Sequence, residues 1–201
     1  MNYTREKTQQ IIDAHRAAAG AMMMRTDFLV PDCFEQQARC LAGHTALVET
    51  AAALLGRPVA FEVSAVNVDK PPLPPAAVLD RLSQFAGRYP VYAANAPTFN
   101  LKARLYPGAV FVVGFDTAAR IVEPRYYGDS QANMLVALDE LRQRGNRFLV
   151  AGRLDDDGLF HELPELALPA GYEALFEAIP ARLFRHDISS TAIRAALKAE
   201  A

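Results

Sequence analysis

The stretch Ala109-Val110-Phe111-Val112-Val113-Gly114-Phe115-Asp116-Thr117 contains the clearest strand of this chain. Its first five residues are apolar and mostly β-branched or aromatic, which is typical of a strand buried on both faces in a parallel sheet. Gly114 and Asp116 follow at once, where α/β folds bind ligands beyond the carboxyl end of a strand. The stretch therefore predicts a parallel sheet with a ligand site beside Asp116, although this carboxylate can instead cap the following helix.

Strands and helices alternate outward from this stretch. Short apolar runs predict strands at 27–30, 59–66, 91–94 and 147–151. Apolar residues at helical spacing predict helices at 45–55, 75–86 and 129–144, with shorter ones after Pro97, near 172–178 and at 192–198. This alternation predicts an α/β fold with helices on both faces of the sheet. Residues 4–24 predict a separate helix, so we expect an N-terminal helical extension over 1–25 and one α/β domain over 26–201.

Composition narrows the possible functions. A net charge of -2 over 201 residues provides no basic surface for nucleic acid, and no apolar run reaches the roughly 20 residues of a membrane span. The polar run Met1–Lys7 predicts no signal peptide, and Cys33 and Cys40 predict free thiols in a reducing compartment rather than a zinc or redox site. We expect a cytoplasmic protein with no nucleic-acid, membrane or resident metal partner, and homo-oligomerisation is left open.

The C-terminal stretch Phe184-Arg185-His186-Asp187-Ile188-Ser189-Ser190-Thr191-Ala192-Ile193-Arg194 places two serines and a threonine before a predicted helix. Such residues cap the free N–H groups of a first helical turn, and the same helix end binds phosphate. The planar guanidinium of Arg194 also suits a phosphate. By residue type alone, a capped helix with a surface arginine explains the stretch equally well.

The order Ile188-Ser189-Ser190-Thr191-x-Ile193-Arg194 resembles the ISSTxIR motif of the nucleotidyltransferase superfamily, in particular the nicotinamide/nicotinate mononucleotide adenylyltransferases. The resemblance implies a Rossmann-like, doubly wound parallel sheet of the nucleotidyltransferase type. It also implies transfer of AMP from ATP, with Mg²⁺, to nicotinamide or nicotinate mononucleotide in NAD biosynthesis, with release of pyrophosphate. Small-molecule nucleotides would then be the partners. The matching segments are Asn67–Leu73, Ala96–Ala103, Gly114–Thr117, Phe148–Arg153 and Phe184–Arg194, and Arg120–Gly128 resembles the same subgroup as Ala96–Ala103.

The resemblance also assigns roles to single residues. In the family, ISSTxIR binds the triphosphate, a G-x-D-[ST] segment lines the nucleotide site, and a Lys and a later Arg reach the substrates. The matching residues here are Ser189, Ser190, Thr191 and Arg194 for the triphosphate, Asp116 for the nucleoside part, and Lys70 and Arg81 for the substrates. Lys70 and Arg81 fit a solvated loop lysine and a helix-surface arginine as well.

One family motif, GxFxPxHxGH, is altered here. Only its last two residues align, as Gly43 and His44, which would make His44 the catalytic residue and Gly43 part of the phosphate site. Leu41, Arg39 and Glu35 stand where the motif has His, Pro and Gly. Loss of one charge-stabilising group commonly lowers the rate about 100- to 1000-fold. His44 also fits a helix-start histidine without a catalytic role.

This departure leaves three interpretations. The first is an adenylyltransferase that works with half of the usual histidine pair. The second is a nucleotide-binding or regulatory pseudoenzyme of the same fold, favoured by Leu41, Arg39 and Glu35. The third is a transferase of cytidylyl groups to another phosphate, which the nicotinamide-type segments favour less.

Overall fold

The computed structural model describes residues 22–25, 34–66, 68, 71–83, 85, 89–155 and 157–185 of the 201-residue chain. For 22–25 and 34–42, and for Asp80 and Ser83, the description covers the backbone. Residues 4–21 of the helix expected at 4–24, the helix expected at 192–198 and the strand expected at 27–30 lie outside these residues.

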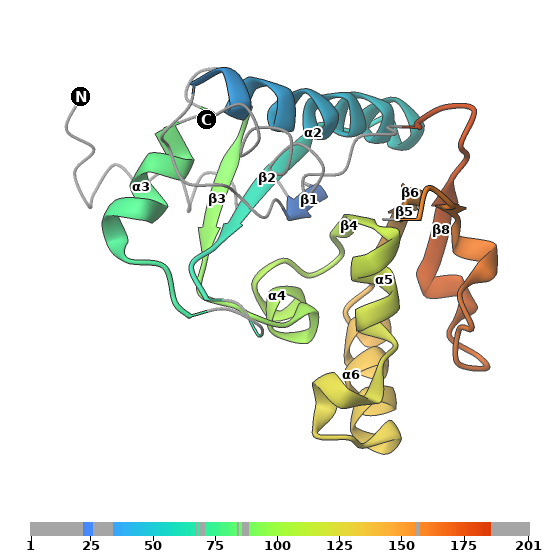
Figure 1. The fold of residues 1–201 in the computed structure, drawn as a ribbon. Coiled ribbons are helices and arrows are strands. Elements are labelled where there is room, and N and C mark those ends of the chain that lie inside the picture. The colour runs from blue at the N-terminus through green and yellow to red at the C-terminus, as the bar shows by residue number, and fades with distance from the viewer. Residues whose placement is uncertain are drawn as a thin grey trace.

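Six strands of the described chain form one sheet (Figure 1). Their order is β3-β2-β1-β4-β5-β8, and every neighbouring pair is parallel. The sheet therefore grows from β1 first to one side and then, from β4, to the other. This confirms the predicted α/β fold with a parallel sheet. The strands are β1 (Met22–Arg25), β2 (Val59–Ser64), β3 (Val91–Ala94), β4 (Val110–Gly114), β5 (Arg147–Ala151) and β8 (Phe176–Ile179).

Helices cover both faces of this sheet, as the alternation of elements predicted. In Figure 1, α2 crosses above the sheet, and α4, α5 and α6 lie below it. One face carries α2 (Phe34–Leu55) and α3 (Pro75–Ser83); the other carries α4 (Phe99–Leu105), α5 (Phe115–Ile121) and α6 (Gln131–Gln143).

The strands whose side chains the structure describes contribute to two separate cores, because successive side chains point to opposite faces. In β4, Phe111 and Val113 pack under α4 and α6, whereas Val112 packs under α2. In β5, Phe148 likewise belongs to the core under α4 and α6, and Leu149 belongs to the core under α2. A central parallel strand is therefore apolar at every position, which is the pattern that Ala109–Val113 shows in the sequence.

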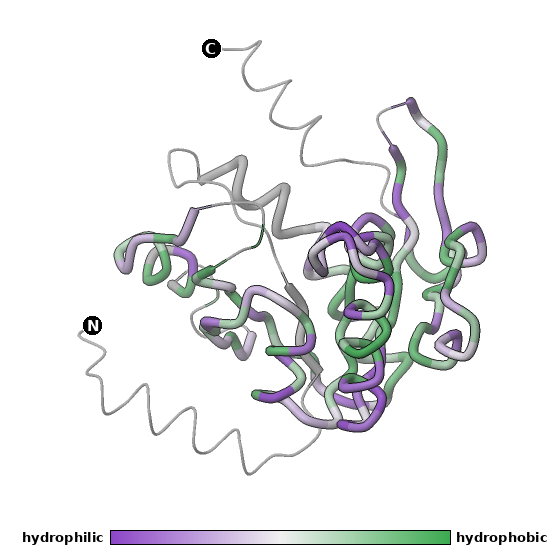
Figure 2. The backbone as a smooth tube through the Cα atoms, turned by 90° about the horizontal axis from the view of Figure 1, so that it is seen from below, coloured by the Kyte–Doolittle hydropathy of each residue, from purple (hydrophilic) through white to green (hydrophobic). Residues whose placement is uncertain are grey.

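The helix predicted at 129–144 is α6, and it is amphipathic as expected. It begins at the N-cap Ser130, whose side chain accepts a hydrogen bond from the backbone N–H of Asn133. Seen from below in Figure 2, hydrophilic and hydrophobic residues alternate along the helices that cover the same face of the sheet as α6. The buried residues of α6 are Met134, Ala137, Leu138 and Leu141.

The N-terminal prediction is wrong at its end. Met22–Arg25 form β1, the central strand between β2 and β4, rather than the last turns of a helix. A run of methionines is apolar enough for either element, and here the pairing of Met23 with Ala60 and Phe111 selects the strand. The α/β domain therefore begins no later than Met22, and the boundary after residue 25 is placed too late.

The helix predicted from Thr45 is also longer than expected, because α2 begins at Phe34. Residues 34–42 are thus helical and not part of a phosphate loop. The physical reason is visible in the sequence. The segment Phe34–Ala42 contains Glu, Gln, Ala, Arg and Leu, which favour helix, and it contains no Gly or Pro to stop one.

The last part of the chain differs from its prediction as well. The expected short helix near 172–178 is a single 3₁₀ turn, η3 (Glu173–Leu175), followed directly by the edge strand β8. Two further 3₁₀ turns, η1 (Pro124–Tyr127) and η2 (Leu163–Glu165), and a hairpin of β6 (Arg153–Leu154) and β7 (Phe160–His161) complete the described elements. Asp155 and Asp157 lie at the hairpin turn, where Asp155 accepts hydrogen bonds from the backbone of Asp157 and Leu159.

Candidate functional site

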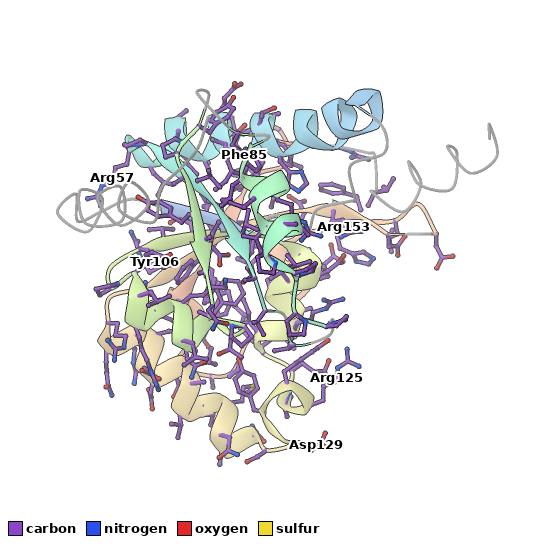
Figure 3. The ribbon with its side chains drawn as sticks, turned by 90° about the vertical axis from the view of Figure 1, so that its left-hand side faces the viewer. Arg57, Phe85, Tyr106, Arg125, Asp129 and Arg153 are labelled. Atoms are coloured by element: carbon purple, nitrogen blue, oxygen red, sulfur yellow. The ribbon has the colours of Figure 1, made fainter. Side chains whose placement is uncertain are left out.

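The carboxyl edge of the sheet contains Asp116, one of the residues that the sequence singled out. Figure 3 shows Arg57 and Tyr106, which precede β2 and β4, on one side of the molecule, and Arg153 and Arg125 on the other. Arg153 follows β5, so this second side is the carboxyl edge. Ligands of α/β proteins bind at such an edge because the loops and helix N-termini after the strands converge there.

Asp116 lies at this edge in the first turn of α5 and forms an ion pair. Its Oδ2 is 2.5 Å from Nη1 of Arg153, and both side chains are about half exposed, at 49% and 41%. Gly114 is the N-cap of α5, and the helix has no side-chain cap, so Asp116 does not serve as the cap. The pair joins the ends of the neighbouring strands β4 and β5.

The hairpin β6–β7 contributes Arg153 to this pair and packs against Phe115, the residue before Asp116. Gly152 packs so closely that a Cβ there would lie 2.6 Å from the ring of Phe160 and 2.9 Å from the carbonyl oxygen of His161. Arg153 is paired with His161 across the hairpin, and the His161 ring stacks on Phe115, with 5.3 Å between ring centroids. The hairpin thus contacts both Asp116 and the preceding Phe115, and only glycine fits at position 152.

His161 lies between two carboxylates, a role that no sequence motif indicated. Its Nε2 is 2.9 Å from Oδ2 of Asp155 and its Nδ1 is 2.7 Å from Oε2 of Glu165. Asp155 first, and then Glu165, raise the pKa of His161 above its usual value. The pKa values of Asp155 and Glu165 are lowered, that of Asp155 first by its hydrogen bond to His161 and that of Glu165 first by the backbone of Glu162. With an acceptor on each ring nitrogen, His161 is favoured as an imidazolium.

A small pocket opens at the same edge of the sheet, with Thr117 of α5 in its lining. It encloses about 50 Å³, whereas pockets that hold whole ligands measure about 300–1,000 Å³, so it can take one chemical group rather than a nucleotide. The three segments around it are far apart in the sequence: the loop after β2, the start of α4, and α5 with η1. The lining residues are Val68, Pro97, Thr98, Phe99, Thr117, Arg120, Ile121, Tyr126 and Tyr127.

A buried ion pair lies behind one wall of this pocket. The Nζ of Lys102, on α4, is 2.5 Å from Oε1 of Glu62 and 2.7 Å from Oγ of Ser64, both on β2. Lys102 and Glu62 expose only 2% of their side chains. Oε2 of Glu62 has no hydrogen-bond partner among the residues that the structure describes. Burying a charged pair costs free energy unless the geometry of the pair is good. Stability alone therefore does not explain why this pair lies here.

This ion pair joins the end of β2 to the pocket wall. Ser64 donates to Glu62 Oε1 at 3.1 Å, with the carbonyl of Ala96 at 3.4 Å, and the backbone N–H of Lys102 donates to the carbonyl of Thr98. Sequence reasoning did not select Lys102, although it lies within the segment Ala96–Ala103 that resembles the family. The available signal was its helical spacing from the apolar Phe99, which places the two on one buried face.

The sites predicted from the sequence are brought together only in part. Gly43 and His44 lie well inside α2, His44 ten residues after Phe34, which is about 15 Å along the axis from where the helix begins. Arg81 lies in the last turn of α3. Lys70, Ser189, Ser190, Thr191 and Arg194 lie outside the described residues. Of the predicted set, Asp116 is the residue that the structure shows at the carboxyl edge.

Within the described ranges, no group of three or more His, Cys, Asp or Glu side chains is placed to hold a metal ion. None of the helices in these ranges is both long and apolar enough to cross a bilayer. A scan against models of protein families, a search of curated proteins and a search of solved structures find no match for this chain.

Proposed function

We propose that this protein is a nucleotidyltransferase that transfers AMP from ATP to nicotinamide or nicotinate mononucleotide. The observation that carries the proposal is the pocket at the carboxyl edge. Three segments that resemble the adenylyltransferases, Asn67–Leu73, Ala96–Ala103 and Gly114–Thr117, each contribute to its lining, together with Arg120–Gly128. Separate segments that resemble one family would meet at one place if they serve one site.

The strand order supports a Rossmann-like, doubly wound sheet. In chain order the six strands lie as 3-2-1-4-5-6, which is the arrangement of dinucleotide-binding folds. In such folds the ligand binds outside the carboxyl ends of the strands, where the direction of winding reverses. Here the reversal lies between β1 and β4, and β4 is the strand that leads to Asp116.

In the proposed reaction, a phosphate oxygen of the mononucleotide attacks the α-phosphorus of ATP. The new P–O bond forms as the bond to the β-phosphate breaks, and pyrophosphate leaves with its electron pair, so no covalent enzyme intermediate is needed. ATP enters as its magnesium complex. The protein would hold the two phosphates in line and stabilise charge. Ser189, Ser190, Thr191 and Arg194 would hold the triphosphate, Asp116 the nucleoside part, and Lys70 and Arg81 the substrates, with His44 stabilising charge.

A second candidate is a protein that binds nucleotides at this edge without catalysing transfer. The start of α2 at Phe34 favours it, because Gly43 and His44 then lie away from the helix N-terminus, where phosphate binds. This candidate is also favoured by the residues that stand where the family motif has His, Pro and Gly, which are Leu41, Arg39 and Glu35.

Pyrophosphate release tests the two candidates. The full chain is incubated with ATP, magnesium and either mononucleotide, with CTP in place of ATP as a third arm. We expect release from ATP that requires the mononucleotide and falls about 100-fold or more in His44→Ala. Glu49→Gln, an exposed change on the same helix, is the matched control and should retain activity.

Other outcomes separate the alternatives. ATP binding by calorimetry without release would establish the second candidate, and release from CTP alone would establish a cytidylyltransferase. Neither binding nor release would refute both nucleotide proposals.

A further inference from the structure

Strand β7 places two aromatic rings on opposite sides of the hairpin. Phe160 and His161 are successive residues of this strand, so their side chains point to opposite faces. The His161 ring stacks on Phe115, the residue before Asp116. The Phe160 ring lies against the backbone of Gly152, which precedes the other strand of the hairpin. One side of β7 therefore contacts the start of α5, and the ring on its other side contacts the beginning of the hairpin.

The ring of Phe160 also contacts the chain that leads to the C-terminal motif. The guanidinium of Arg185 lies over this ring, with its Cζ 4.6 Å from the ring centroid. A cation over an aromatic face at such a distance is attracted by the negative face of the ring. Arg185 is the last residue that the structure describes. Phe160 thus joins the hairpin to the point where the chain continues toward the motif.

Further contacts hold residues 180–185, which we call the stem. The backbone N–H of Ala181 donates to Oε1 of Glu162, the residue that follows β7, at 3.2 Å. The N–H groups of Leu183 and Phe184 donate to the carbonyl that begins the stem, at 2.9 and 3.2 Å. The side chain of Phe184 packs against the core under α2. The stem is therefore a folded turn, and the hairpin strand β7 with its following residue contacts it near both ends.

The stem limits where the C-terminal motif can lie. Ser189, the first residue proposed to hold the triphosphate, follows Arg185 by four residues. Four residues of extended chain span at most about 14 Å, so the position of Arg185 bounds the position of Ser189. Asp116, which is proposed for the nucleoside part, is paired with Arg153 of the same hairpin. The hairpin thus contacts both parts of the proposed nucleotide site.

We propose that Phe160 is a positioning residue, which holds the stem through Arg185 so that the C-terminal motif meets the triphosphate of a nucleotide bound at Asp116. This inference rests on the proposed function, since it adds a residue to the machinery of that same site. Phe160 acts through Arg185 and does not itself contact the nucleotide. A contact can shift an equilibrium by no more than its own free energy. Arg185 is exposed, so we expect effects of about two- to fivefold, the range for a cation over a ring at an exposed site.

Hydrogen exchange tests the hold on the stem without any nucleotide. Phe160→Leu keeps an apolar side chain but removes the aromatic face. The amides of Leu183 and Phe184 should then exchange about two- to fivefold faster than in the wild type, whereas the amides of α6 should keep their rates. Tyr172→Leu is the matched control, because it removes a similar contact elsewhere, that of Arg142, which lies 5.1 Å from the Tyr172 ring centroid. This control should leave the exchange of the stem unchanged.

A double-mutant cycle separates this contact from other effects of the substitutions. Arg185→Gln removes the cation, and Phe160→Leu should add nothing to the exchange of the stem in that background, because the contact is already lost. Arg185→Lys keeps a cation that can lie over the ring, so it should retain most of the wild-type protection. Additive effects of the two substitutions would show that Phe160 does not act through Arg185.

Calorimetry on the full chain tests the positioning role. Phe160→Leu should raise the Kd for ATP with magnesium by about two- to fivefold. It should leave the Kd for adenosine, measured by competition with ATP, unchanged, because adenosine lacks the phosphates that the C-terminal motif would bind. A merely structural effect of the substitution would weaken both ligands alike. Arg185→Lys should bind ATP more tightly than Arg185→Gln.

Each contrary result has a distinct meaning. Unchanged exchange of the stem in Phe160→Leu would overturn the hold of Phe160 on the stem. Faster exchange with an unchanged Kd for ATP, or equal losses for ATP and adenosine, would overturn the positioning role while leaving nucleotide binding intact. A wild-type protein that does not bind ATP would refute the proposed function and, with it, the positioning role, whatever the exchange rates are.

Discussion

At the scale of single residues, Lys102 is the clearest case of a side chain whose surroundings depart from its type. Its ammonium is buried against Glu62 and Ser64, in a part of the fold where apolar packing is often at least as stable as a buried ion pair. The pair holds the end of β2 against α4, and so it positions the wall of the pocket. We interpret it as an element of pocket geometry rather than as a source of net stability.

This interpretation predicts an asymmetry between single and double substitutions. Lys102→Met should lower the free energy of unfolding by about 3–5 kcal/mol, because it leaves the Glu62 carboxylate buried without its partner. The double variant Lys102→Met with Glu62→Met should recover most of that loss, since apolar replacement of a buried pair is often neutral. Urea denaturation of the wild type, the single variant and the double variant measures this directly. A double variant as unstable as the single one would contradict it.

Arg153 depends on the residue that precedes it. Gly152 has no room for a Cβ, because Phe160 packs closely against its backbone. This close contact and the ion pair of Arg153 with Asp116 therefore depend on the backbone of the same two adjacent residues. The sequence drew attention to this segment through its resemblance to the family. It did not predict the partner of Asp116, because the two residues meet only when β4 and β5 are paired.

At the scale of elements, the hairpin β6–β7 is joined to η2 through the side chain of His161. His161 bridges Asp155 at the hairpin turn and Glu165 on η2. The raised pKa of His161 means that its protonated form is favoured by folding, so its contribution is fully present below about pH 6.5 and is lost as pH rises through the folded pKa. The lowered pKa values of Asp155 and Glu165 have the opposite sign, and their contribution is lost only in acid.

We therefore expect the hairpin to loosen as pH rises above about 6.5. An NMR titration should place the pKa of His161 above that value, and hydrogen exchange of hairpin amides, corrected for the intrinsic pH effect, should accelerate between pH 6 and 9. His161→Asn should remove this dependence. A pKa at or below 6.5, or equal pH dependence in the variant, would show that the carboxylates do not hold the proton.

The elements also show which local sequence patterns are sufficient to predict a helix or a strand. The helix α6 and the strand β4 were predictable because Met134, Leu138 and Leu141 repeat at helical spacing, and because Ala109–Val113 is an unbroken apolar run. The strand β8 was missed because four residues carry too little periodicity and follow helix-favouring residues. Its identity as a strand comes from pairing with β5.

At the scale of the whole molecule, the reversal of strand order between β1 and β4 is what gives the carboxyl edge its proposed function. If nucleotides bind there, binding should stabilise the whole domain. ATP with magnesium at a hundredfold excess over its Kd should raise the free energy of unfolding by about 2.7 kcal/mol, or the Tm by about 5–10 °C for a chain of this size. Calorimetric melting with and without ATP measures the shift, with magnesium chloride at equal ionic strength as the control. An unchanged Tm at millimolar ATP would contradict nucleotide binding.

The sequence alone determined the alternation of strands and helices, the position of β4 and α6, and the segments that surround the pocket. These depend on periodicity and turn residues, which act over a few neighbouring positions. Only the tertiary structure decided that Met22–Arg25 form the central strand, that α2 begins at Phe34, and that Lys102 meets Glu62 across 40 positions of chain. Such contacts arise from pairing and packing between distant segments, whose partners no local pattern specifies.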